Sequence, residues 1–178
     1  MLACAAMPRS PSTRIPALLR AAALVRERAH APYSHYPVGA AVLAGGRIFA
    51  GCNMENSAYP LSVCAERNAM AMAVAAGFKR IDAVAVVGGR HRPSAPCGGC
   101  RQVLAEFATP GTPVVYASEG GQTIATTIGA LLPSAFTRSD VTEAAPVSRR
   151  SRPVTRSRAV SGTGRSAARV RGTRSSGR

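Results

Sequence analysis

Residues 64–100 read CAERNAMAMAVAAGFKRIDAVAVVGGRHRPSAPCGGC, and they contain a predicted helix, a predicted strand and the start of a second predicted helix. Its first part, 64–76, is rich in Ala and Met and lacks Pro and Gly, so it predicts a buried helix that Gly77 ends. A run rich in β-branched residues at 81–87 predicts a central strand. A second helix is expected at 100–108, so both groups of cysteines lie at or near the start of a helix.

The segments outside this stretch continue the alternation of helices and strands. Apolar residues at helical spacing predict helices, and two apolar runs on either side of a short Gly-containing turn predict a β-hairpin. Such an order indicates an α/β fold in which helices cover the faces of a sheet. The predicted elements are helices over 17–30 and 128–132 and strands over 37–43, 47–53 and 113–117.

The positive charge of the chain is concentrated at its C-terminal end. The 178 residues carry a net charge of +15, and residues 144–178 contain ten Arg and no acidic residue. Residues 1–143 hold 13 basic and 8 acidic residues, a net of +5. Residues 144–178 also lack aromatics and are rich in Ser, Thr and Gly, so we expect a disordered tail. The predicted organisation is an N-terminal extension (1–16), a catalytic domain (17–143) and this tail.

Hydropathy excludes a membrane-spanning protein, and the cysteine content disfavours a disulfide-linked one. No apolar run approaches the roughly 20 residues of a membrane span, and the nearest, 17–25, contains Arg20. Five cysteines are an odd number without a clear secretory signal, which disfavours a disulfide framework and favours an intracellular metal or catalytic role. Four Arg and no acid before Glu27 leave an organellar presequence as an alternative. We expect a cytoplasmic protein with no membrane partner.

Three cysteines have the spacing of metal ligands. Cys64 is followed two residues later by Glu66, and Cys97 and Cys100 form a Pro-Cys-x-x-Cys motif. Structural zinc sites nearly always use four protein ligands, whereas three ligands with an open position are typical of catalytic zinc. A Cys-x-Glu followed by Pro-Cys-x-x-Cys is the pattern of zinc deaminases, in which the Glu does not bind the metal. A purely structural Cys-x-x-Cys is the alternative.

The residues around the cysteines fit catalysis at such a site. Three thiolates and Zn²⁺ carry a net charge of −1, which weakens the metal as a Lewis acid. Two helix N-termini and the adjacent Arg67 would offset this charge. Glu66 would lie beside a water molecule at the metal, take its proton and pass it to the substrate as a general acid–base.

About 110 residues of the chain resemble the cytidine deaminases of the short, homotetrameric class. This resemblance implies a three-layer α/β/α fold with a mixed central sheet, a zinc ion held by Cys64, Cys97 and Cys100, and a proton shuttle at Glu66. The resembling stretches are residues 32–41 (PYSHYPVGAA), 51–56 (GCNMEN), 59, 63–67, 94–107 and 131–136 (LLPSAF).

The resemblance also assigns substrate-binding residues. Asn53 and Glu55 match the pair that hydrogen-bonds the ribose 3′-hydroxyl, and residues two apart on a strand face the same side. Tyr36 stands where the family has a Phe that stacks on the pyrimidine, and its hydroxyl needs a partner or water. Ala65 is a further candidate. Phe136 matches an aromatic that the family lends to the site of a neighbouring subunit, although ordinary packing of a terminal helix is the alternative.

The resulting functional hypothesis is zinc-dependent hydrolysis of cytidine and 2′-deoxycytidine to uridine and 2′-deoxyuridine plus ammonia, a reaction of pyrimidine salvage. Deaminases of other small substrates, such as blasticidin S, share the zinc motif and form one alternative. A polynucleotide deaminase or nucleic-acid-binding protein that uses the Arg-rich tail is another. The tail has no aromatics for base stacking, so we expect no nucleic-acid partner. An inactive zinc scaffold would have no use for Glu66.

Overall fold

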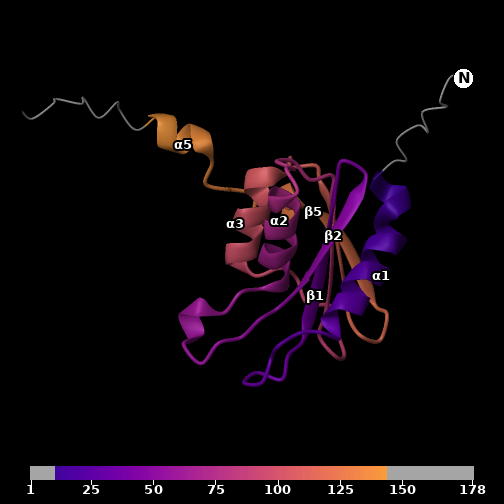
Figure 1. The fold of residues 1–178 in the computed structure, drawn as a ribbon. Helices are drawn as coiled ribbons and strands as arrows, with labels where there is room; N and C mark the ends of the chain where they lie inside the picture. Colours follow the sequence, from indigo (N-terminus) through magenta and orange to yellow (C-terminus); the bar gives the residue numbers. More distant parts are fainter. Residues whose placement is uncertain (1–10, 144–178) are drawn as a thin grey trace, which may run out of the picture. The chain divides into compact units, whose positions relative to one another are not determined.

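The computed structural model describes residues 11–143, which contain a five-stranded mixed sheet (Figure 1). The strand order is β2-β1-β3-β4-β5. The pair β3 and β4 is parallel, and the other neighbours are antiparallel. The strands are β1 (Val38–Ala44), β2 (Arg47–Cys52), β3 (Ala83–Gly88), β4 (Pro113–Ala117) and β5 (Thr123–Thr127).

Helices cover both faces of this sheet. Helix α1 lies on one side of the sheet, and α2 and α3 lie on the other (Figure 1). The predicted α/β fold with a mixed central sheet between two helical layers is therefore confirmed. The helical segments are η1 (Pro11–Arg14), α1 (Ile15–Arg26), η2 (Tyr59–Leu61), α2 (Ala65–Ala75), α3 (Gly98–Phe107), α4 (Ile128–Leu131) and α5 (Arg138–Glu143).

Alternate residues of the central strands form two cores, one on each face. On β1, Ala40 and Val42 pack into the cluster that includes residues of α2 and α3. Ala41 and Leu43 of the same strand pack with Leu18 of α1 in the second cluster. Both faces of β1 are therefore buried, which explains why residues 37–43 read as a continuous apolar run instead of an alternating one.

The predicted elements are found, with corrections at three places. The helix expected over 17–30 runs from Ile15 to Arg26. Neither the strand Thr123–Thr127 nor the short helix Arg138–Glu143 is predicted from the sequence. The side chains of Thr123, Ile124 and Ala125 in that strand are exposed, so the segment lacks the buried apolar pattern of an inner strand, and its pairing with β4 defines it as an edge.

The early end of α1 has a tertiary cause. After Arg26 the chain tightens into a turn, in which the N–H of Ala29 donates to the Arg26 carbonyl at 3.0 Å. His30 then forms a bridge beside Met54: its N–H donates to the Asn53 carbonyl at 3.1 Å, and its carbonyl accepts from Glu55 N–H at 2.8 Å. Pairing with the segment after β2 thus replaces the last helical turn that local spacing predicts.

Some predictions fall outside the described part of the chain. The proposed tail over 144–178 and most of the N-terminal extension, residues 1–10, lie outside it, and the division into domains stays a prediction. Within residues 11–143, no helix is both long enough and apolar enough to cross a membrane.

Two glycines allow helices to approach the sheet closely, one on each face. A Cβ on Gly39 of β1 would lie 2.0 Å from the Ala22 carbonyl oxygen of α1. A Cβ on Gly51 of β2 would lie 2.5 Å from the backbone nitrogen of Ala69 in α2. Backbone atoms cannot move aside as a flexible side chain can. The distance of α2 from the sheet therefore depends on the missing side chain at Gly51.

We expect Gly51→Ala to lower the free energy of unfolding by about 1–3 kcal/mol, because the added methyl group forces α2 away from β2. Urea denaturation followed by circular dichroism measures this change. The matched control is Gly111→Ala, whose added Cβ would meet no atom within 4 Å, so its effect should stay within about 0.5 kcal/mol. Equal stability of the two variants would contradict the close-approach argument.

Candidate metal centre and substrate cavity

The start of two helices brings three cysteines together. Cys64 is the N-cap residue of α2, Cys97 is the N-cap residue of α3, and Cys100 is the third residue of α3. Their sulfur atoms all lie within 4.8 Å of one another. Cys64 is partly buried, Cys97 is exposed and Cys100 is buried. Both groups of cysteines therefore lie at helix N-termini, as the sequence predicts.

The spacing of the sulfurs fits a tetrahedral metal ion. The sulfurs of Cys64 and Cys97 are 3.9 Å apart. Two sulfurs that each bind zinc at about 2.3 Å in a tetrahedral arrangement would be roughly 3.8 Å apart. Three thiolate donors also suit zinc better than calcium or magnesium, which prefer oxygen ligands. The group can hold a metal ion with three protein ligands, leaving a fourth position free.

The protein environment favours a thiolate at Cys64. A hydrogen bond from the Cys100 thiol, together with the Arg67 guanidinium, lowers the pKa of Cys64 to about 5. The same hydrogen bond and burial raise the pKa of Cys100, because its proton is shared with the Cys64 sulfur. Arg67 donates to the Ser62 carbonyl at 3.1 Å and lies 3.9 Å from the Cys64 sulfur. One cation is thus fixed against the sulfur cluster.

Glu66 lies in the first turn of α2, beside the cysteines and outside their ligand cluster. Its side chain is almost wholly buried, with 5% of its surface exposed. Burial raises its pKa, and the negative charge of Cys64 adds to this effect. A carboxyl group with a raised pKa accepts a proton more readily at neutral pH than an exposed one, as general acid–base catalysis requires.

A cavity of about 390 Å³ opens beside the cysteines. This volume is within the usual range for small-molecule sites. The cavity is lined by all the predicted substrate-binding residues except Phe136. Its lining residues are Ser34, Tyr36, Val38, Asn53, Glu55, Cys64, Ala65, Glu66, Val86, Ser94, Ala95 and Cys97.

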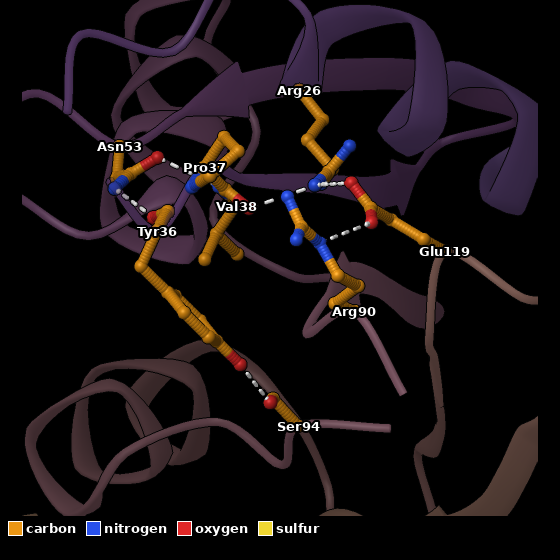
Figure 2. A network of polar contacts seen from close by, with 8 residues as sticks. All are labelled: Arg26, Tyr36, Pro37, Val38, Asn53, Arg90, Ser94 and Glu119. Carbon is orange, nitrogen blue, oxygen red and sulfur yellow. Dashed lines mark hydrogen bonds and ion pairs between the residues drawn. The ribbon is translucent and has the colours of Figure 1, made fainter. Parts of the chain in front are cut away.

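Asn53 uses its side-chain amide to hold the segment that enters β1. Its Oδ1 accepts from the Val38 N–H at 2.8 Å, and its Nδ2 donates to the Tyr36 carbonyl at 3.0 Å (Figure 2). Each of these atoms keeps one further site for a hydrogen bond. Asn53 therefore shapes the cavity wall and can still bind a ligand.

Glu55 is held by a turn of the neighbouring chain segment. Its carboxylate accepts from the N–H groups of Tyr33 at 3.0 Å and Ser34 at 3.2 Å, and from the Ser34 hydroxyl. These bonds, led by the Ser34 hydroxyl, lower the pKa of Glu55. Glu55 thus presents a negative charge at the cavity.

Phe136 lies away from this cavity in the same chain. Its side chain is 63% exposed, and its carbonyl accepts from Gln102 Nε2 at 2.6 Å. It lines a different hollow, together with residues of α3 and α4.

Sequence reasoning misses two polar residues of the cavity, Ser34 and Ser94. Ser34 bonds Glu55, and the Ser94 hydroxyl bonds the hydroxyl of Tyr36 (Figure 2). The sequence holds one signal for the second bond, which is that a phenol in place of a phenyl ring needs a partner.

Comparison with known proteins gives a consistent result. Residues 12–117 match the cytidine and deoxycytidylate deaminase zinc-binding region. A cytidine deaminase of Sporosarcina psychrophila is 49% identical over 121 residues, which are 67% of this chain and 89% of that protein. A cytidine deaminase of Halalkalibacterium halodurans is 42% identical over 127 residues, which are 71% of this chain and 96% of that protein.

Solved structures give the same match. The crystal structure of cytidine deaminase from Burkholderia pseudomallei has a TM-score of 0.66 and 48% identity, covering 68% of this chain and 98% of that one. A crystal structure of cytidine deaminase from Mycobacterium leprae has a TM-score of 0.58 and 37% identity, covering 66% of this chain and 96% of that one. With its zinc-binding region, its cysteine cluster and its fold in agreement, the chain belongs to the cytidine deaminase family.

Proposed function

We propose that this protein hydrolyses cytidine and 2′-deoxycytidine to uridine and 2′-deoxyuridine with release of ammonia. The observation that carries the proposal is the convergence, on one cavity, of a buried carboxyl group, cysteines of a three-sulfur cluster, and an amide and a carboxylate that can bind hydroxyls. Family membership supports the same chemistry. A spectrophotometric assay that follows the loss of the cytidine absorbance band tests it directly.

In this proposal Cys64, Cys97 and Cys100 hold the zinc ion. When bound, zinc lowers the pKa of a water molecule and so makes a nucleophile available at neutral pH. The N-termini of α2 and α3 and the Arg67 guanidinium offset the negative charge of three thiolates. Arg67 therefore acts through the Cys64 sulfur as a positioning residue.

Glu66 carries the proton through the reaction. It takes one proton from water and delivers it to N3 of the pyrimidine ring. Once the water oxygen is bonded to C4, Glu66 moves the second proton of that oxygen to the leaving amino group. The water oxygen ends on C4 and the C4–N bond breaks, which gives uridine and ammonia. The burial of Glu66 raises the pKa of its carboxyl group, which supports this role because the group must both accept and release a proton.

Asn53 and Glu55 bind the ribose in this proposal, and Tyr36 and Ala65 contact the base. The support is their common position on the cavity wall and the remaining hydrogen-bonding capacity of the two polar side chains. A cavity of about 390 Å³ is within the range that holds a small molecule such as a nucleoside. Turnover of blasticidin S in preference to cytidine would instead favour the other small-molecule alternative.

The assembly proposed from the family resemblance is a homotetramer in the cytoplasm. Phe136 of one subunit would then reach the site of a neighbour. Its exposure, together with its distance from the cavity of its own chain, supports this arrangement, because an exposed aromatic ring is available to a partner.

Glu66→Gln should keep the fold and the metal but lower kcat by about 10²–10⁴-fold, because the amide is similar in shape and cannot shuttle a proton. Steady-state kinetics and metal analysis on the same preparation measure both effects. Glu27→Gln, at the exposed end of α1, is the matched control and should retain full turnover. Near-normal kcat in Glu66→Gln would rule out the assigned role.

Cys97→Ala and Cys100→Ala should each lose zinc and unfold more easily, because the binding energy of the metal contributes to folding. Metal analysis after dialysis, with thermal unfolding, measures the change. The control is Cys52→Ala: this thiol bonds the Arg28 carbonyl at 3.5 Å and is outside the sulfur cluster. One full zinc per chain in either ligand variant would contradict the ligand assignment.

Glu55→Gln should raise KM for cytidine by more than about tenfold, since a hydrogen bond to a charged group contributes roughly 1.5–3 kcal/mol. Zinc content should stay unchanged. Free cytosine, which lacks the sugar, is the internal control, and its poor turnover should be insensitive to the substitution. If cytidine kinetics stay intact, or if a single-stranded oligonucleotide containing C is the better substrate, the nucleoside assignment is wrong.

A further inference from the structure

A hydrogen bond joins two walls of the substrate cavity. The hydroxyl of Tyr36, in the segment that enters β1, bonds the hydroxyl of Ser94, in the segment that leads from β3 to Cys97 (Figure 2). Both residues line the cavity. The two residues are 58 positions apart, so this contact belongs to the tertiary structure alone.

The Tyr36 side of the contact is rigidly held. Its N–H donates to the Ser34 hydroxyl at 3.1 Å, and its carbonyl accepts from the Asn53 amide at 3.0 Å. The next carbonyl, of Pro37, accepts from Arg26 Nε at 3.0 Å, and Arg26 is itself paired with Glu119 (Figure 2). The N–H is thus fixed within the loop by Ser34, and the two carbonyls are fixed by side chains from distant parts of the chain, Asn53 and Arg26. The phenol ring of Tyr36 therefore extends from a backbone segment that these hydrogen bonds hold in place.

The Ser94 side of the contact has few other supports. At one end of its segment the Gly89 carbonyl accepts from the Glu119 N–H at 2.9 Å, and at the other the Pro96 carbonyl accepts from Arg101 Nε at 2.7 Å. Between these two anchors, two side chains contact other parts of the chain: the exposed Arg90 pairs through its Nε with a Glu119 carboxylate oxygen at 3.9 Å, and the Ser94 hydroxyl bonds Tyr36 (Figure 2). The Ser94 bond is the one that reaches the segment before β1. The segment leads directly to Cys97, so its position bears on the cysteine cluster.

Gly89 leaves room for this contact. Its φ is +84°, and a Cβ there would lie 2.4 Å from the Arg92 carbonyl oxygen, 2.9 Å from the Ser94 hydroxyl oxygen and 3.0 Å from the Tyr36 hydroxyl oxygen. A side chain at this position would therefore crowd both partners. The backbone between β3 and the Ser94 segment is shaped so that the two hydroxyls can meet.

We propose that Tyr36 and Ser94 are positioning residues that clasp the segment before Cys97 against the segment before β1 and so set the width of the cavity in which the pyrimidine lies. This proposal rests on the proposed function of the cavity. The phenol gives this chain a link that a phenylalanine at the same position could not form. The clasp fixes a wall for substrate binding and takes no part in proton transfer.

Kinetics on the full-length, zinc-loaded protein test the effect on the substrate. Tyr36→Phe and Ser94→Ala should each raise KM for cytidine roughly two- to tenfold, the effect of one lost hydrogen bond, with a smaller change in kcat. The double variant should be no worse than the more impaired single variant, because both remove the same bond. Ser94→Thr keeps a hydroxyl and should restore KM. Tyr116→Phe removes a phenol outside the cavity and is the control.

Limited trypsin digestion tests the clasp without any need for activity. Arg90 lies in the clasped segment with its side chain 82% exposed. Mass spectrometry should show faster cleavage of the Arg90–His91 bond in Tyr36→Phe, Ser94→Ala and the double variant than in the wild type, Ser94→Thr or Tyr116→Phe, because local opening exposes this bond.

The two measurements separate the possible outcomes. Additive effects on KM, or a raised KM without faster cleavage, would overturn the clasp and assign the hydroxyls to separate substrate contacts. Faster cleavage with an unchanged KM would overturn its role in positioning the substrate. If the wild type fails to turn over cytidine, the proposed function is wrong. The digestion alone then decides whether the clasp exists. Equal cleavage of the Arg90–His91 bond in all variants would show that it does not.

Discussion

Three cysteine sulfurs within 4.8 Å of one another are the central constraint on this structure, because thiolates at this distance repel unless a cation lies among them. The three sulfurs come together because the N-termini of α2 and α3 lie side by side. Cys64 begins α2, the chain then crosses the sheet as β3, and Cys97 begins α3. Because β3 and β4 are parallel, the chain between them has to cross one face of the sheet, and α3 in this crossover lies against α2.

The position of α2 on the sheet also buries Glu66, the proposed proton carrier. Gly51 lets α2 approach β2, and Asn68 of α2 donates to the Cys52 carbonyl at 2.8 Å. Glu66 lies in the first turn of this closely packed helix, and burial there raises its pKa. The contact that holds the helix to the sheet therefore also creates the environment that proton transfer requires. The close packing of α2 on β2 thus contributes both to the stability of the fold and to the raised pKa of Glu66.

Local sequence patterns predict the elements whose apolar faces are buried. The helix start at Cys64 and the central strands follow from composition, spacing and glycine positions. The second helix, expected from residue 100, begins two residues earlier, at Gly98. The end of α1 cannot be predicted in this way. His30 pairs with Met54, 24 residues further along the chain, and this pairing replaces the last turn of the helix. Strand β5 is missed for a related reason. Its exposed residues carry little apolar signal, and pairing with β4 makes them a strand.

Some residues of the candidate substrate cavity can likewise be identified from local sequence, and others only from the fold. Asn53 and Glu55 reach one cavity although β2 ends at Cys52, because bridges at Met54 keep the chain extended and preserve the alternation of side chains. Tyr36 is different, since its hydroxyl can be identified from the sequence but its partner cannot. Ser94 carries no signal of its own, and only the fold brings it to the phenol. A departure from a family pattern at one residue is therefore interpretable only together with the distant residue that satisfies it.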